Sequence, residues 1–473
     1  MVLASNRGPV SFDEDGAGRL VLRRGGGGLI SGLRAAAHDS EAMWVCAALG
    51  DADRRAAREA GDDGRIDIAG HDTDGTRVRM LGIDPTTYHR AYNAVANRTL
   101  WFLHHLLFDV ASAPAFDERF RRDWAAYTEY DEAFALALAE EAAPGAVIVV
   151  QDYHLTLTPR MLRQRRPDLR IGHFSHTPWA PASYFELLPQ DIAHDILTGL
   201  LAADSVGFLC QRWAEAFLDC CQHVLGARVD ANTVTYAGHQ TCVRVHSLGV
   251  DPAELRRRAA QPDVTARKAA LAEMVGDRRL LLRIDRTEMS KNIVRGLAAY
   301  RELLRTRPEW HGRVVHVAFA YPSRHDLPEY REYTAAVQQM AEEIEDEFAT
   351  PYWAPLVLEV NDDYARSLAA YCLADALVVN PIRDGMNLVA KEGVVLSERD
   401  LALVLSREAG AAVELGSGAL VINPFDVSGT AAAMHTALTM PAAERAARRR
   451  LLVDGATALP PREWLAQQVT ALS

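Results

Sequence analysis

The chain has 473 residues, of which 49% are hydrophobic and 24% are charged, and its formal net charge is -12. This length exceeds what one hydrophobic core supports, so two domains are expected. The acidic balance argues against nucleic acid or an anionic membrane as a partner. The six cysteines lack zinc-type spacing, and neither an export signal nor a membrane-spanning run is present, so the composition predicts a cytoplasmic protein.

The beginning of the chain combines an apolar run with a glycine run. The apolar residues 2–4 lead into Arg7, which places this cation at the C-terminal edge of a predicted strand, where α/β proteins bind ligands. Four glycines at 25–28 precede a helical pattern. Such glycines let the backbone approach a ligand, and a helix N-terminus suits a phosphate. A flexible hairpin tip explains the same run equally well.

Polar side chains follow two later apolar runs. Residues 146–150 form a predicted strand that ends just before Asp152, and the next apolar run ends at His176. Asp152 could orient a hydroxyl or help to accept its proton. A lone histidine is usually structural, but two polar residues at neighbouring strand ends favour a crevice. Tyr92 and Trp101 lie in a helical segment whose spacing alone is more typical of core aromatics.

The second half repeats this alternation. The apolar runs that predict its strands are residues 280–285, 314–320, 356–360, 376–379, 401–406 and 419–423. Arg286 and Lys291 follow the first of them, five residues apart across a turn, so both cations can grip a diphosphate. The pattern predicts an α/β protein with two doubly wound domains facing each other across a cleft. We expect domains at 1–250 and 251–459, with a terminal helix at 460–473 packing on the first.

The segment 380–392, NPIRDGMNLVAKE, joins a buried strand to a helix through a turn that contains Asp384 and Gly385. Free amide groups and the positive end of a helix dipole bind anions at such a turn. Glu392 lies one or two turns into the helix, where a carboxylate reaches hydroxyls but repels a nearby phosphate. A sugar nucleotide satisfies both conditions, with phosphates on the amides and Glu392 on a ribose. An ordinary Asn-capped turn accounts for the segment equally well.

Nine motifs occur in one order along the chain: SNRGP, GGGGL, YNAVANRTLW, QDYHLTLTP, HFSHTPWAP, DRTEMSK, PSRHD, RDGMNLVAKE and INPFD. In this set the chain resembles the trehalose-phosphate synthases, retaining glucosyltransferases of glycosyltransferase family 20 with the GT-B fold. The resemblance covers nearly the whole chain. It implies transfer of glucose from a nucleoside diphosphate glucose to glucose 6-phosphate, giving alpha,alpha-trehalose 6-phosphate without a cofactor or a metal.

The resemblance also implies roles for individual residues. Donor binding is implied for Gly28, Arg286, Lys291, Asp384, Gly385, Met386, Asn387, Leu388, Val389 and Glu392. Acceptor binding is implied for Arg7, Tyr92, Trp101, Asp152 and Arg324. The residues implied in catalysis are Asp152, His176, Arg286, Lys291 and Asp384. Within these sets, the two cations and the amides of Gly28, Leu388 and Val389 would hold the diphosphate, Glu392 the ribose, and Asp384 and His176 the glucosyl hydroxyls.

Two departures from the family pattern bear on the donor. Residues 286–291 read Arg-Thr-Glu-Met-Ser-Lys where many relatives have Arg-Leu-Asp-Tyr-Ser-Lys, so both cations are kept. The segment 361–364 is acidic where the family places the donor's base. A carboxylate accepts well from the two donors on one edge of guanine, whereas uracil offers one. On this ground we expect GDP-glucose rather than UDP-glucose.

Two other functions are open to a chain of this kind. One is a pseudo-glycosyltransferase of the validoxylamine type, which couples a cyclitol-type donor to an amino-cyclitol phosphate. The other is a non-catalytic regulator that binds sugar phosphates. The presence of all the cations and carboxylates of the implied site favours the synthase over both. Helices on the outside of the domains could form a dimer or tetramer, and no patch in the sequence selects a state.

Overall fold

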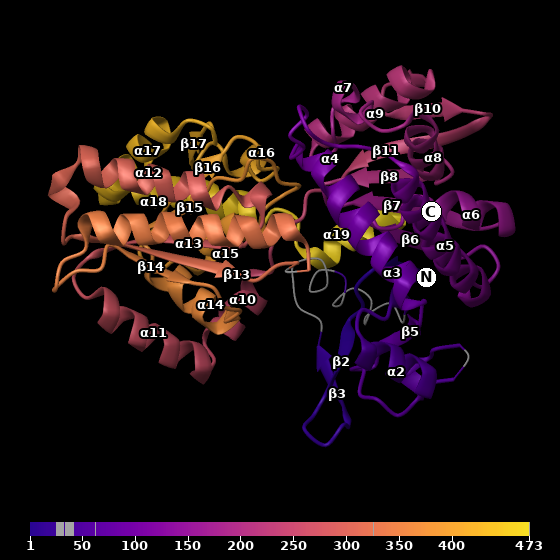
Figure 1. The fold of residues 1–473 in the computed structure, drawn as a ribbon, viewed down its shortest axis with the longest axis horizontal. Helices are drawn as coiled ribbons and strands as arrows, with labels where there is room; N and C mark the ends of the chain where they lie inside the picture. Colours follow the sequence, from indigo (N-terminus) through magenta and orange to yellow (C-terminus); the bar gives the residue numbers. More distant parts are fainter. Residues whose placement is uncertain (25–32, 34–41, 62, 325, 473) are drawn as a thin grey trace. The chain divides into compact units, whose positions relative to one another are not determined.

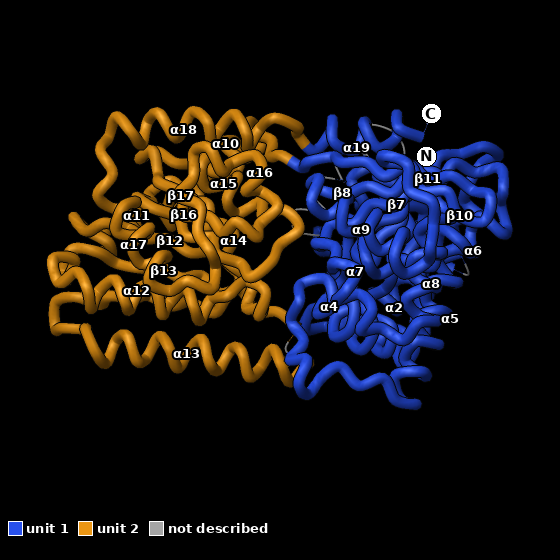
Figure 2. Tube along the Cα trace, turned by 90° about the horizontal axis from the view of Figure 1, so that it is seen from above, with its two compact units in different colours: residues 1–248, 461–473 blue, residues 249–460 orange. Residues whose placement is uncertain are grey.

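The structure is a computed structural model that describes residues 1–24, 33, 42–61, 63–324 and 326–472 (Figure 1). The chain divides into two compact units (Figure 2). Unit 1 comprises Met1–Leu248 and Pro461–Ser473, and unit 2 comprises Gly249–Pro460. Each unit is built on a largely parallel sheet, so the predicted α/β class is confirmed. No described helix is both long enough and apolar enough to cross a membrane.

Unit 1 contains a nine-stranded sheet in the order β5-β4-β1-β6-β7-β8-β11-β10-β9. Its strands are β1 (Val2–Ser5), β4 (Met43–Ala47), β5 (Arg77–Leu81), β6 (Val147–Gln151), β7 (Arg170–Ser175), β8 (Ser205–Phe208), β9 (Arg228–Asp230), β10 (Thr233–Tyr236) and β11 (His239–Val245). All neighbours pair in parallel except β10, which is antiparallel to β9 and β11. A separate hairpin joins β2 (Val10–Glu14) and β3 (Leu20–Arg24).

The order in which the chain adds strands to the unit 1 sheet reverses beside β1. The chain runs from β1 outward through β4 to β5, and then β6 pairs with the opposite side of β1. In doubly wound sheets a crevice forms at the carboxyl ends of the strands where the order reverses. The residues after β1 and β6 therefore lie at this reversal point, and these include Arg7 and Asp152.

The helical segments of unit 1 are α2 (Asp51–Glu59), η1 (Ile66–Ile68), α3 (Pro85–His89), η2 (Arg90–Leu100), α4 (Trp101–His105), α5 (Glu118–Glu141), α6 (Thr158–Arg165), α7 (Ala182–Phe185), α8 (Gln190–Leu200), α9 (Gln211–Leu225) and α19 (Pro461–Thr470). The segment η2 is a π-helix. This form is rare in proteins, and where it occurs it is often at a functional site. Helix α19 packs against β6, so the end of the chain is part of this unit.

Unit 2 contains a six-stranded, wholly parallel sheet in the order β14-β13-β12-β15-β16-β17. Its strands are β12 (Arg279–Arg286), β13 (Val314–Tyr321), β14 (Leu356–Glu359), β15 (Ala376–Val379), β16 (Ala402–Ser406) and β17 (Leu420–Ile422). The order reverses between β12 and β15, which pair directly. Arg286 ends β12, residues 287–291 follow it, and residues 380–387 follow β15, so both segments lie at the reversal point.

The helical segments of unit 2 are α10 (Pro252–Ala259), α11 (Pro262–Val275), η3 (Met289–Lys291), α12 (Ile293–Thr306), η4 (Pro308–Trp310), α13 (Pro328–Phe348), α14 (Tyr364–Leu373), α15 (Leu388–Leu396), α16 (Ala412–Leu415), α17 (Val427–Thr439) and α18 (Ala442–Ala456). Helix α12 packs against α13 and α17, whereas α11, α14, α15 and α18 pack in a second series. Because both faces of a doubly wound sheet are covered, β12, β13 and β15 are almost wholly buried.

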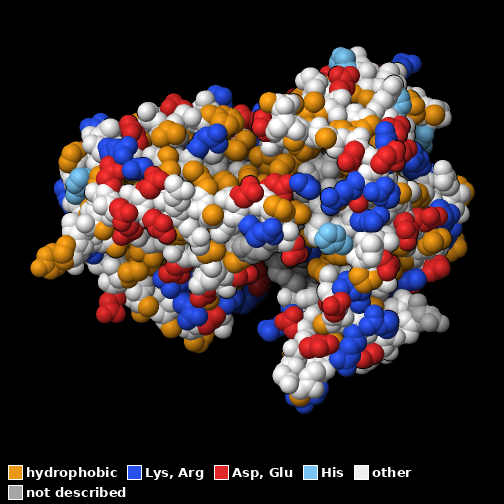
Figure 3. Space-filling view, in the orientation of Figure 1, with side chains coloured by type: hydrophobic (Ala, Val, Ile, Leu, Met, Phe, Trp, Pro, Cys, Tyr) orange, Lys and Arg blue, Asp and Glu red, His pale blue; other side chains and the backbone are white. Residues whose placement is uncertain are grey.

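The visible surface carries charges of both signs. Acidic and basic side chains are interspersed over the face shown in Figure 3, on each unit. The excess of acidic residues is therefore spread out on this face, and a site that binds phosphate must be built from local groups.

Candidate functional site

The loop after β12 carries a buried carboxylate between cations. The Arg286 side chain is 46% exposed, and its Nη1 lies 3.1 Å from Oε1 of Glu288, which is fully buried. Burial opposes ionisation of Glu288, but the charges of Arg286, Arg324 and Lys291 outweigh it and lower its pKa to about 2. This carboxylate is therefore ionised at neutral pH, and it anchors the arginine that the sequence assigns to the diphosphate.

Glu288 was absent from the predicted site. Its position two residues after Arg286 gave no sign that it is buried, because loop residues between cations are usually solvated. Arg324 reaches the same carboxylate, with its Nη1 3.8 Å from Glu288 Oε1, and also donates to Tyr330 at 2.5 Å. The backbone of Arg324 is left-handed, with φ of 45°. Such a conformation persists in a non-glycine residue only where its surroundings hold it.

The second cation of the predicted grip has a carboxylate partner. Lys291 Nζ lies 2.5 Å from Asp384 Oδ2, and both side chains are 14% exposed. Asn387 donates to the same Asp384 oxygen at 3.1 Å. The Ile382 amide donates to the Ser290 carbonyl at 2.8 Å, which ties the loop after β12 to the loop after β15. The structure thus brings Lys291, Asp384 and Asn387 together, although the first two are 93 positions apart.

The N-terminus of α15 presents backbone donors. Asn387 caps the helix, with φ of 86° and its Oδ1 accepting from the Ala390 amide at 3.1 Å. Within the described part of the chain, the N–H groups of Leu388 and Val389 donate no hydrogen bond. Two such amides, together with the helix dipole, form an anion-binding position.

The turn before α15 is held by the loop after β16. The Met386 side chain is buried, and its carbonyl accepts from the Ala411 amide at 2.8 Å. A side chain on Gly410 would place its Cβ 2.0 Å from the carbonyl oxygen of Gly385. Only glycine allows this approach, so the position of the turn is fixed by backbone contact.

Glu392 lies one turn into α15 beside a tyrosine. Tyr371 donates to Glu392 Oε2 at 3.3 Å, and burial raises the pKa of Glu392 to about 7. Near neutral pH the carboxyl therefore exists in both protonation states. In either state it can exchange a hydrogen bond with a ligand hydroxyl, as the predicted contact with a ribose requires.

In unit 1, Asp152 occupies the reversal point in a strained conformation. Its φ is 74°, and its amide donates to the Phe174 carbonyl at 2.7 Å. Its Oδ1 accepts from the His176 amide at 3.1 Å, and its Oδ2 lies 4.0 Å from His154 Nδ1. Left-handed backbone at a non-glycine residue costs about 1–3 kcal/mol and clusters at functional sites. The carboxylate is thereby fixed at the strand end.

His176 is held as a neutral imidazole. Burial lowers its pKa to about 3, and its Nε2 lies 2.8 Å from Gln151 Oε1. Because an amide oxygen only accepts, Nε2 carries the proton and Nδ1 remains an acceptor. A neutral ring can hydrogen-bond to a sugar hydroxyl but cannot supply a positive charge.

The aromatic residues of the predicted acceptor site join Asp152 through its neighbours. Tyr92, within η2, stacks on His154 with ring centroids 5.6 Å apart. Trp101, at the start of α4, packs on Tyr153 at 5.7 Å. Two aromatics that periodicity alone assigns to the core thus lie against the segment that follows β6. Arg7 is exposed after β1, and its carbonyl accepts from Ser5 Oγ at 2.6 Å.

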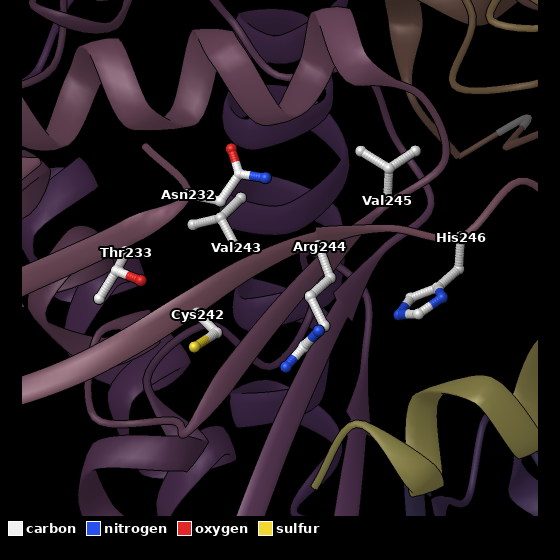
Figure 4. Close-up of a pocket in the computed structure, with 7 residues that line it drawn as sticks. All are labelled: Asn232, Thr233, Cys242, Val243, Arg244, Val245 and His246. Atoms are coloured by element: carbon white, nitrogen blue, oxygen red, sulfur yellow. The ribbon is translucent and has the colours of Figure 1, made fainter. Parts of the chain in front are cut away.

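The predicted site residues are divided between the two units, and one of them is not described. Gly28 lies outside the described residues. Arg324 belongs to unit 2, whereas Arg7, Tyr92, Trp101 and Asp152 belong to unit 1. An open pocket of about 370 Å³ in unit 1 is lined by none of the predicted site residues (Figure 4); its lining consists of Asn232, Thr233, Cys242, Val243, Arg244, Val245 and His246. It lies along β10 and β11, away from the strand reversal.

One of the two carboxylates in the acidic segment 361–364 is bound within its own unit. Asp363 caps α14 by accepting from the Arg366 amide at 3.0 Å. Its other carboxylate oxygen accepts from Arg267 at 2.7 Å. A carboxylate with both oxygens bound in this way is a poor acceptor for a base, so the premise of the GDP-glucose expectation is weakened.

Comparison with known proteins identifies relatives across the whole chain. The model of glycosyltransferase family 20 matches residues 1–473. An Aspergillus niger alpha,alpha-trehalose-phosphate synthase [UDP-forming] is 31% identical over 460 residues, covering 93% of this chain and 90% of the relative. A probable alpha,alpha-trehalose-phosphate synthase [UDP-forming] from Arabidopsis thaliana is 31% identical over 95% of this chain, which spans 54% of that relative. The chain thus spans about half the length of some curated relatives.

Solved structures agree with the sequence relatives. "Trehalose-6-phosphate from E. coli bound with UDP-2-fluoro glucose" has a TM-score of 0.86 and 27% identity, covering all of this chain and 98% of that one. An alpha,alpha-trehalose-phosphate synthase (UDP-forming) from Burkholderia vietnamiensis has a TM-score of 0.85 and 28% identity, covering 100% and 99%. The predicted GT-B fold is confirmed, and none of these names supports GDP-glucose. The chain belongs to glycosyltransferase family 20.

Proposed function

We propose that the protein is a retaining glucosyltransferase that transfers glucose from UDP-glucose to glucose 6-phosphate and forms alpha,alpha-trehalose 6-phosphate. The observation that carries the proposal is the cluster at the strand reversal of unit 2. There an arginine, a lysine–aspartate pair and two helix amides that donate no hydrogen bond among the described residues lie on two linked segments. UDP-glucose is chosen because the relatives are named as UDP-forming and because Asp363 is engaged within its own unit.

The cluster suits the departure of a diphosphate. Negative charge grows on the leaving group as the glycosidic bond breaks, so cations and amides aimed at it stabilise the transition state more than the ground state. Arg286 and the amides of Leu388 and Val389 would bind the diphosphate. Lys291 would share its charge between that group and Asp384, which would itself accept from glucosyl hydroxyls. Glu392 would bind the ribose.

Unit 1 would bind the acceptor. Asp152, fixed by its strained backbone and by the His176 amide, would accept from ring hydroxyls of glucose 6-phosphate. Arg7, Tyr92 and Trp101 would contact its phosphate. The family resemblance assigns Arg324 to the acceptor phosphate as well. His176, neutral at all physiological pH values, would bind a glucosyl hydroxyl. We infer a same-face displacement: the bond between the glucosyl C1 and the diphosphate oxygen breaks, and the acceptor oxygen bonds to C1 on the same face. An oxygen of the departing diphosphate accepts the proton of the acceptor hydroxyl.

An assay of nucleoside diphosphate release tests the proposal. The purified protein is supplied with UDP-glucose or GDP-glucose at equal concentration, with and without glucose 6-phosphate. We expect UDP release that requires the acceptor and yields a phosphorylated disaccharide with both anomeric centres in the α configuration, checked by NMR. Asp384→Asn serves as the inactive control.

The outcomes separate the alternatives. Release that does not depend on glucose 6-phosphate, or an absence of release, would favour the pseudo-glycosyltransferase or the regulator. Faster turnover with GDP-glucose would contradict the donor assignment and leave the glucosyl transfer itself intact.

A further inference from the structure

Glu288 lies between two arginines that the proposed function assigns to different substrates. Its Oε1 is 3.1 Å from Arg286 Nη1 and 3.8 Å from Arg324 Nη1, and it accepts from Ser323 Oγ at 2.8 Å. Arg286 is the last residue of β12, and Arg324 follows β13, the adjacent parallel strand. One carboxylate oxygen therefore receives the side chains that extend from two neighbouring strand ends.

We propose that Glu288 is a positioning residue that fixes Arg286 and Arg324 as one unit, so that it governs binding of both the donor diphosphate and the acceptor phosphate. The inference rests on the proposed function for the identity of the two phosphates. Glu288 itself touches neither substrate in this scheme. Its side chain is fully buried, whereas Arg286 is 46% exposed and Arg324 is 10% exposed.

The charges of the cluster explain why a carboxylate is needed there. Arg286, Arg324 and Lys291 are cations, and Glu288 and Asp384 are the carboxylates paired with them. Two guanidinium groups that lie close together repel each other, and a carboxylate between them makes the net electrostatic interaction of the three groups attractive. Removal of Glu288 would take from both arginines the carboxylate that they share, and Arg324 would keep its hydrogen bond to Tyr330. Flexible arginines must be ordered by the ligand, and this ordering weakens binding.

Opposite signs distinguish positioning from simple electrostatics. Loss of one negative charge makes the cluster more positive, so Coulomb attraction alone predicts tighter binding of anions in Glu288→Gln. Positioning predicts weaker binding. The sign of the change in Kd therefore reports which effect dominates.

The experiment measures binding without turnover. Calorimetric titration with UDP, and separately with glucose 6-phosphate, is carried out on the wild type, Glu288→Gln and Glu288→Asp. We expect Glu288→Gln to raise the Kd of both ligands roughly tenfold, in the range found for coupled contacts. Glu288→Asp keeps the charge and should stay within about threefold of the wild type, because a shorter carboxylate still attracts both guanidinium groups.

Asp375→Asn is the matched control. Asp375 is a buried carboxylate of the same unit that also pairs with two arginines, Arg279 at 2.6 Å and Arg399 at 3.5 Å. It precedes β15 and lies at the opposite ends of the strands from the cluster. Its substitution should lower the melting temperature and leave both Kd values unchanged.

The outcomes are separable from those of the proposed function. If the wild type transfers no glucose but Glu288→Gln weakens binding of both ligands, the function is wrong and the positioning role stands. If Glu288→Gln binds both ligands as well as the wild type or more tightly, or if only one Kd rises, the positioning role is overturned. If Glu288→Gln does not fold, Ser323→Ala is used instead, because it removes the hydrogen bond to Glu288 Oε1 without changing the charge of the cluster. It should raise both Kd values by about two- to threefold, and no change would overturn the inference.

Discussion

Replacement of Arg286 by alanine should separate catalysis from stability. In the proposed mechanism the guanidinium contacts the leaving diphosphate, and loss of one such donor costs about 2.7–4 kcal/mol, or roughly 10²–10³ in kcat. The effect on stability should be smaller. Arg286 is about half exposed, and Glu288 keeps Arg324 and the Ser323 hydroxyl after the change. We expect a loss of about 1–2 kcal/mol, below the 3–5 kcal/mol that follows complete loss of a buried partner.

The assay measures kcat for UDP release at saturating substrates, together with the thermal midpoint. Arg286→Lys is the control, because it keeps the charge but not the planar guanidinium that matches a phosphate. Its kcat should lie between those of the wild type and Arg286→Ala. A folded Arg286→Ala variant with a rate within about threefold of the wild type would refute the assignment of the diphosphate grip. A large fall in the thermal midpoint would instead show that Arg286 acts mainly as the partner of Glu288.

Three further predictions concern pH and strain. The pKa of Glu392 is about 7 in the folded state and 4.5 for an ordinary glutamate, so the free energy of unfolding should fall as pH rises between these values. Denaturant unfolding at pH 4.5 and 8 should show a decrease of about 2–3 kcal/mol in the wild type that Glu392→Gln abolishes. His316 is fully buried, neither ring nitrogen has a hydrogen-bond partner among the described residues, and its pKa is lowered from 6.5 to about 3. As pH falls below 6.5, His316 therefore binds a proton in the unfolded chain but not in the folded one, which lowers the free energy of unfolding. Between pH 7 and 4, His316→Leu should lose about 3 kcal/mol less of this free energy than the wild type, and an equal loss in the two proteins would contradict the expectation. Asp152→Ala should raise the KM for glucose 6-phosphate about tenfold or more and leave that for UDP-glucose near its original value; an equal rise in both would place Asp152 outside the acceptor site.

The fold was accessible from the sequence because the strand pattern is simple. Parallel strands are covered on both faces and read as short apolar runs, so the run at 314–320 predicted β13 to within one residue. The π-helical form of η2 was not accessible, since residues 90–100 have the composition of an ordinary helix.

The candidate site was only partly accessible. Positions at strand ends could be identified, because Arg286 and Asp152 each follow an apolar run and the order reverses beside their strands. Contacts between distant residues could not. The Lys291–Asp384 pair joins loops 93 positions apart, and the burial of Glu288 depends on Ser323 and Arg324 of the next strand. The ion pair between Asp363 and Arg267 is a further contact between distant residues, and it weakens the reason for expecting guanine.

The return of α19 to unit 1 bears on how the chain folds during synthesis. Trp464 is fully buried, donates to the His246 carbonyl at 3.0 Å and packs on Phe174. These partners emerge from the ribosome more than 200 residues earlier than Trp464 itself. At a translation rate of about 5–20 residues per second, the surface that α19 covers stays exposed for roughly 10–40 s. The first unit therefore completes its core only after residues 461–470 have been synthesised.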